Sequence, residues 1–217
     1  MRPPWLAFVV IGFVSAVVLL FFAVRLRPIT PAPRPEQIVA GSLTKPTVTF
    51  VNPTLGNPAA RVTIVEFADF QCTPCAQFDT ALAAVLKTYP HDVRIVWKDA
   101  PNDSAHPLST AAAVAAHCAD RQVKFWEYHD LLFERQSFLS AGQFDAIAAE
   151  LKLDTAAFTA CNSSQETLGI VEHDTEEARG LGLTATPTVY VNDEQVVGAL
   201  TTDELLGYVE RALHPTK

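Results

Sequence analysis

A Cys-x-x-Cys motif between a buried strand and a helix constrains this chain more than any other feature. Residues 61–68, before the motif, are rich in β-branched and aromatic side chains, as buried strands are. From Phe78 to Tyr89, after the motif, apolar side chains recur at helical spacing. We therefore predict that Cys72 and Cys75 mark the start of a helix that follows a strand, where a dithiol forms a redox site.

The two cysteines are expected to have different roles. A thiolate at a helix N-terminus faces unpaired N–H groups and the positive end of the helix dipole, which lowers its pKa from about 8.5, to as low as ~3.5 in extreme cases. We therefore predict that Cys72 is the nucleophile and that Cys75, one turn later, is the resolving thiol. Thr73 and Pro74 lie between them and are predicted to contact the substrate. Pro74 suits the first turn because its missing N–H would have no intrahelical partner there.

The charge distribution argues against a nucleic acid partner. The chain has 217 residues, of which 49% are hydrophobic and 18% charged, so it is long and apolar enough to bury a core. Four of its 16 basic residues precede Glu36, the first acidic residue, so the remaining 12 accompany all 24 acidic side chains. Such a field repels phosphate, and no basic stripe is interleaved with aromatics.

The N-terminus contains an uncharged apolar run of twenty residues, from Trp5 to Val24. Its length predicts one transmembrane helix, with residues 1–25 as the anchor; the alternative is a cleaved signal peptide. Arginines after the run favour a cytoplasmic C-terminal part, but large domains are translocated largely regardless of charge. We therefore expect a single-pass protein of the cell membrane with its catalytic domain on the extracytoplasmic side.

The rest of the chain divides into four segments by pattern. Residues 26–46 are proline-rich and predict an extended tether. Residues 47–100 predict a strand at 47–51, a loop at 52–58, the motif with its strand and helix, and a further strand at 93–98. The β-α-β crossover makes a parallel pair.

The second half of the chain begins with helices only. Residues 101–182 predict an all-helical insertion. Residues 183–217 return to β structure with a hairpin that turns at Asn192-Asp193, and they end in a helix near 202–212. The expected fold class is therefore α/β.

This order of elements resembles the thioredoxin fold, and its details resemble the DsbA-like branch. The approach to the motif, from Glu66 to Cys72, is similar to that branch's acid-aromatic-x-Asp-aromatic-x-Cys pattern. The helical insertion is also a feature of the branch, and the stretch Lys124–Phe133 resembles membrane-anchored or secreted bacterial members. Proline is second inside the motif, as in thioredoxin itself, so an oxidant's potential does not follow from the resemblance.

The resemblance implies further site residues. It makes Pro187 the cis-proline that faces the active site, with the backbone of Thr186 offered to an extended substrate segment. The alternative is an ordinary trans proline entering an edge strand. Glu66 and Lys98 occupy positions that resemble a charged pair beneath the active site, where Glu66 would act on the proton of Cys75. The alternative is an ion pair at a strand end.

Two further cysteines, Cys118 and Cys161, fall on different predicted helices. We expect a structural disulfide between them in an oxidising compartment; the alternative is two buried thiols. A Cys-x-x-Cys can also be half of a zinc site, but the other half should then be a pair of Cys or His residues close together in the sequence. Cys118 and Cys161 are instead two separate single cysteines. We predict no metal and no cofactor.

The sequence thus predicts an extracytoplasmic thiol–disulfide oxidoreductase that exchanges a Cys72–Cys75 disulfide with substrate protein thiols. We expect an oxidase that a membrane redox partner resets. One alternative is a reductase or isomerase on the same fold. Another is a membrane-tethered binding or metal-handling module without turnover.

Overall fold

The computed structural model describes residues 15, 21 and 39–215. The chain separates into two compact units, residues 1–37 and 38–217, and the sheet and its helices belong to the second. Apart from residues 15 and 21, the predicted membrane span lies outside the described residues, as does most of the predicted tether. Within the described ranges, no helix is both long and apolar enough to cross a bilayer.

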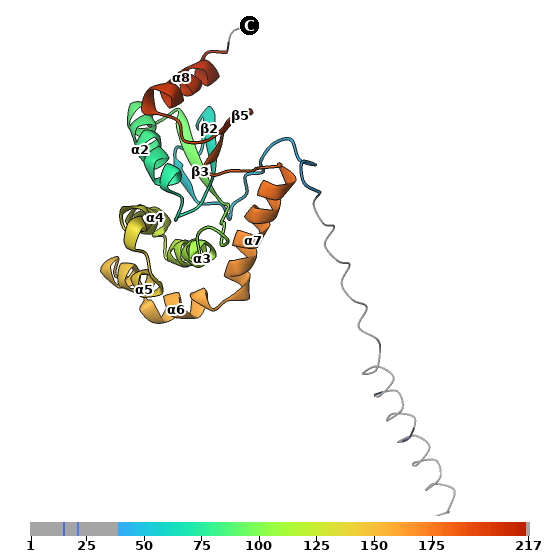
Figure 1. Cartoon of the computed structure of the whole chain (residues 1–217), viewed down its shortest axis with the longest axis vertical. Helices are drawn as coiled ribbons and strands as arrows, with labels where there is room; N and C mark the ends of the chain where they lie inside the picture. Colours follow the sequence, from blue (N-terminus) through green and yellow to red (C-terminus); the bar gives the residue numbers. More distant parts are fainter. Residues whose placement is uncertain (1–14, 16–20, 22–38, 216–217) are drawn as a thin grey trace, which may run out of the picture. The chain divides into compact units, whose positions relative to one another are not determined.

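A five-stranded sheet in the order β1-β3-β2-β4-β5 forms the centre of this unit (Figure 1). The central strands β2 and β3 are parallel, as the predicted crossover requires, and the other pairs are antiparallel. The hairpin of β4 and β5 turns at the predicted Asn192-Asp193. The strands are β1 (Thr54–Gly56), β2 (Val62–Ala68), β3 (Val93–Asp99), β4 (Thr188–Val191) and β5 (Glu194–Val197).

Helices cover both faces of the sheet. One face packs against α2 (Thr73–Thr88) and α8 (Thr202–Leu213), which lie side by side, through a core that includes Ile64. The other face packs against α7 (Gln165–Gly180), where Ala178 joins a smaller apolar cluster. The alternation of side chains along each strand therefore decides which helix a residue meets.

The predicted helical insertion is confirmed between β3 and β4. Its core contains Phe70, Cys72 and Cys75, so the insertion covers the motif directly. The predicted disulfide between Cys118 and Cys161 is formed and joins α3 to α6. The remaining helices of the insertion, which α7 completes, are α3 (Ser109–Asp120), α4 (Phe125–Glu134), the short 3-10 helix Gln136–Phe138, α5 (Ala141–Glu150) and α6 (Thr155–Asn162).

The predicted first strand at 47–51 is wrong. The N–H and Oγ1 of Thr47 donate to Glu177 Oε1 at 2.5 and 2.7 Å, and the N–H of Thr49 donates to the side chain of Asn52 at 2.9 Å. These donors are therefore used by side chains rather than by a neighbouring strand. The first strand is β1, inside the predicted loop, where Gly56 has a φ of +97° and would place a Cβ 2.6 Å from the carbonyl oxygen of Val93.

Candidate active site

Cys72 and Cys75 lie where β2 leads into α2, as predicted. Cys72 is the N-cap of this helix, and its Sγ accepts a hydrogen bond from the N–H of Cys75 at 3.3 Å. Both cysteines are free thiols. Cys72 retains 4% of its surface exposed and Cys75 none, so an incoming sulfur meets Cys72 first.

The surroundings of Cys72 favour its thiolate. A hydrogen bond from the Cys75 side chain, helped by the Thr186 side chain and the N–H of Cys75, lowers the pKa of Cys72 to about 6. Burial and the charge of Asp69 act in the opposite direction but do not cancel these bonds. Cys72 is therefore mostly ionised at neutral pH and is a good leaving group.

Cys75 has the opposite character. Its burial, the hydrogen bond with Cys72 and the charge of Glu66 raise the pKa of Cys75 above its usual value. A Cys75 thiolate released from a disulfide is therefore short-lived and needs a proton. The pair thus combines a stabilised outer thiolate with an inner thiol.

Glu66, on β2, is the buried acid within electrostatic range of Cys75. Its Oε1 has no hydrogen-bond partner among the described residues. Burial, and then the charges of Asp79 and Cys72, raise the pKa of Glu66 well above its usual value. A carboxyl group shifted toward its protonated form is suited to exchange a proton with Cys75. The position predicted for Glu66 is therefore consistent with its predicted role.

Asp79 is a neighbour that the sequence interpretation missed. It lies one turn after Cys75 on the same face of α2, and burial raises its pKa too. Oxygens of Asp79 and Asp130 and a ring nitrogen of His129 lie within 4.8 Å of one another. Asp130 is largely exposed, and the charge of Asp79 is the one in this group that acts on Glu66. The four-residue spacing of Cys75 and Asp79 in the predicted helix could have indicated that the two side chains lie on the same face.

The predicted pair of Glu66 and Lys98 is wrong. Glu66 stands opposite Trp97 in the parallel register, so Lys98, the next residue, faces the other side of the sheet. There its Nζ lies 2.8 Å from Asp174 Oδ1 and 2.7 Å from Glu177 Oε2, with all three side chains buried. Lys98 therefore neutralises carboxylates of α7 and does not reach the motif.

Thr186 and Pro187 form the opposite wall of the site. The Thr186–Pro187 peptide bond is cis, as predicted. The Sγ–H of Cys72 donates to the carbonyl oxygen of Thr186 at 3.3 Å. Thr73 and Pro74 are exposed beside the cysteines. The residues predicted to contact a substrate therefore lie on both sides of Cys72, with Thr73 and Pro74 on one side and Thr186 and Pro187 on the other. Their contact with a substrate stays a prediction.

Asp69 holds the turn before the motif. It is buried and accepts hydrogen bonds from the N–H groups of Gln71 at 2.7 Å and of Asn102 at 3.2 Å. It also pairs with His106 Nδ1 at 2.7 Å. Asp69 was part of the sequence pattern, but its partners Asn102 and His106 belong to the loop after β3, and no local signal indicated them.

Gln136 fixes the same turn from the helical insertion. Its Nε2 donates to the carbonyl oxygens of Phe70 at 2.9 Å and of Cys72 at 3.0 Å. These two bonds link the position of the nucleophile to the insertion. Nothing in the sequence around Gln136 predicted this contact, which spans more than sixty residues.

The fold and the Cys-x-x-Cys site together define a protein with the thioredoxin fold. The family model described as Thioredoxin matches residues 49–211, which include the motif, the insertion and the cis-proline. The chain therefore belongs to the thioredoxin family.

Solved structures and curated relatives agree with this fold. A thioredoxin-like oxidoreductase from Silicibacter pomeroyi DSS-3 is 28% identical with a TM-score of 0.68, over 77% of this chain and 95% of that chain. Oxidised BdbD from Bacillus subtilis is 25% identical with a TM-score of 0.70, over 82% and 99%. The Na(+)/H(+) antiporter NhaA 3 from Salinispora tropica is 34% identical over 157 residues, 72% of this chain and 24% of the antiporter. The chain thus spans about a quarter of the length of the curated relatives it matches.

Proposed function

We propose that this protein is an extracytoplasmic, membrane-tethered thiol–disulfide oxidase that donates a Cys72–Cys75 disulfide to substrate proteins. The observation that carries the proposal is the low pKa of Cys72, about 6, beside a buried Cys75 whose pKa is raised. Stabilising the outer thiolate stabilises the reduced form, which makes the disulfide a better oxidant. The similarity to a thioredoxin-like oxidoreductase from Silicibacter pomeroyi supports the same class of reaction.

The reaction proceeds by two exchanges. A substrate thiolate attacks Cys72 Sγ, a mixed disulfide forms, and the Cys72–Cys75 bond breaks with Cys75 leaving as a thiolate that takes a proton from Glu66. A second substrate thiolate then attacks the substrate sulfur, and Cys72 leaves as a stable thiolate. Two substrate thiols become one disulfide, and the enzyme is left as a dithiol for a membrane redox partner to reoxidise.

The site suits an extended substrate segment. The carbonyl oxygen of Thr186 lies 3.3 Å from Cys72 Sγ, so a substrate strand bonded to Cys72 would pass within reach of the Thr186 backbone. Thr73 and Pro74 would contact the same segment from the other side. Backbone pairing tolerates many side chains, which fits a protein that oxidises various substrates.

Two observations support an oxidising location. The disulfide between Cys118 and Cys161 is of the kind that persists outside the cytoplasm. The apolar run at 5–24 is long enough to anchor the chain, and the proline-rich stretch after it would hold the catalytic unit away from the membrane.

The direction of electron flow is tested by the redox potential. Equilibration with glutathione buffers should give a potential closer to about −120 mV, the value for DsbA, than to about −270 mV, the value for thioredoxin. The oxidised protein should also oxidise a reduced two-cysteine peptide stoichiometrically. A potential near that of thioredoxin, with rapid insulin reduction, would instead support the reductase alternative.

Glu66→Gln should slow disulfide transfer on the order of 10²-fold, because glutamine keeps the shape but cannot supply the proton that Cys75 requires. Stopped-flow measurement of peptide oxidation checks this value. Glu134→Gln, at an exposed position on α4, is the matched control and should leave the rate unchanged. An unchanged rate in Glu66→Gln would remove Glu66 from the mechanism.

A further inference from the structure

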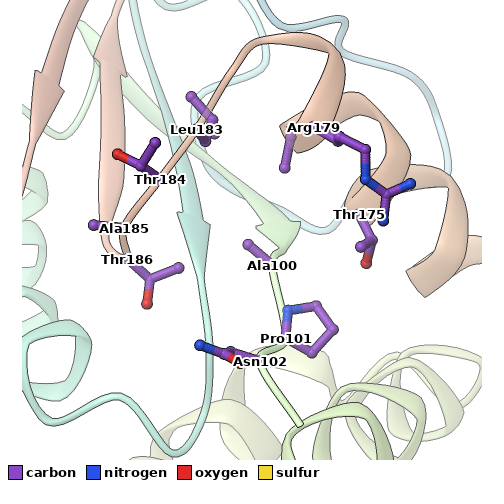
Figure 2. Close-up of a pocket in the computed structure, with 10 residues that line it drawn as sticks. Ala100, Pro101, Asn102, Thr175, Arg179, Leu183, Thr184, Ala185 and Thr186 are labelled. Atoms are coloured by element: carbon purple, nitrogen blue, oxygen red, sulfur yellow. The ribbon is translucent and has the colours of Figure 1, made fainter. Parts of the chain in front are cut away.

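A pocket of about 260 Å³ opens directly beside Thr186, the residue whose carbonyl oxygen contacts Cys72. Figure 2 shows its three walls: the loop with Thr184 to Thr186, the segment Ala100–Asn102 after β3, and Thr175 with Arg179 on α7. The pocket therefore begins where a substrate bonded to Cys72 would lie and continues toward α7.

The loop wall offers unused backbone groups. Among the described residues, the N–H groups of Thr184, Ala185 and Thr186 make no hydrogen bond, whereas the Ala185 carbonyl accepts one from Thr188 Oγ1 at 2.7 Å. Thr184 and Ala185 are exposed. A substrate segment that pairs with Thr186 can thus continue along this loop in extended form.

The pocket is cationic in a mostly acidic protein. Arg179 is the one charged residue in its lining, and no hydrogen bond or ion pair of the Arg179 side chain occurs within the described part of the chain. The amide of Asn102 and the hydroxyl of Thr184 add further donors. Asp103, Glu172 and Glu176 border an adjacent pocket that Arg179 also lines, and their charges weaken the field of Arg179 without entering the lining of the first pocket.

We propose that this pocket binds an acidic side chain of the substrate, two residues from the cysteine that bonds to Cys72. Alternate side chains of an extended segment point to the same side, and two residues span about 6.6 Å. A carboxylate there would meet the guanidinium of Arg179, which forms paired bonds with carboxylates. The inference rests on the proposed thiol–disulfide exchange and adds a substrate preference to it.

Single-cysteine peptides that carry Glu, Gln or Lys two residues before or after the cysteine test this subsite. At one of these two positions, before or after the cysteine, we expect the oxidised protein to react about two- to fivefold faster with the Glu peptide than with the Lys peptide. The difference in rate should be smaller in high salt. Arg179→Gln should abolish the preference. Arg211→Gln, an exposed arginine on α8, should retain it.

The outcomes separate the two proposals. No reaction with the Gln peptide would contradict thiol–disulfide exchange itself. Reaction at equal rates with all three side chains, or a preference that survives in Arg179→Gln, would overturn the acidic subsite and leave the exchange reaction standing.

Discussion

Cys72→Ser is expected to lose disulfide exchange by at least on the order of 10³-fold, down to the uncatalysed rate, because it removes the reacting sulfur. Cys75 cannot replace it, since this thiol has no exposed surface and burial raises its pKa. Peptide oxidation and insulin reduction should both disappear, whichever direction the wild-type protein favours.

Cys75→Ser is the matched variant, because it keeps the nucleophile and removes only the resolving thiol. The substrate for this test carries its thiol as a mixed disulfide with a small thiol. The Cys72 thiolate should attack the substrate sulfur and release the small thiol, so a covalent complex through Cys72 should accumulate, visible on a non-reducing gel and lost with reductant. Residual turnover above a tenth of wild type in Cys72→Ser would contradict the assignment of the nucleophile.

Lys98→Met is expected to lower the free energy of unfolding by about 3–5 kcal/mol at pH 7, because it leaves two buried carboxylates without their cation. The ammonium lies 2.8 Å from Asp174 and 2.7 Å from Glu177, and its side chain is 0% exposed. Urea unfolding measures the loss. Lys87→Met, at an exposed position in the last turn of α2, should change stability by less than about 0.5 kcal/mol.

The loss in Lys98→Met should depend on pH. Burial raises the pKa of Glu177, but the hydrogen bonds from Lys98 and Thr47 and the charge of Lys98 outweigh it and lower this pKa. The contribution of Glu177 is therefore present above its unfolded pKa near 4.3 and is lost as the pH falls through the folded value. Without Lys98 the buried carboxylates favour protonation, so the variant is penalised most at neutral pH and least near pH 4. Normal stability with lost activity would restore a catalytic role for Lys98.

Most of the fold could be predicted because local patterns and distant packing agree. Residues 61–68 are rich in β-branched and aromatic side chains, as a strand buried on both faces requires, and the helix from Thr73 follows the motif as its spacing indicates. The region at 47–51 alternates between polar and apolar residues as a strand does, yet it forms no strand. Its hydrogen-bond partner Glu177 is 130 residues away, and no local pattern reports such a contact.

The site could be predicted where a residue's role depends on its own chemistry. Cys72, Cys75 and Pro187 are such residues. Lys98 could not be placed, because a shift of one residue in strand register moves a side chain to the opposite face. Gln136 was missed because two hydrogen bonds across a long separation position it.

Titration of the Cys72 thiolate tests the central claim most directly. Thiolate absorbance of the reduced protein, measured against pH with Cys72→Ser as the blank, should show one transition with a pKa of about 6. Because the folded pKa lies below the usual value, the reduced form gains stability over the oxidised form as the pH rises above 6. A transition near the ordinary thiol value of about 8.5 would contradict the proposed stabilised leaving group.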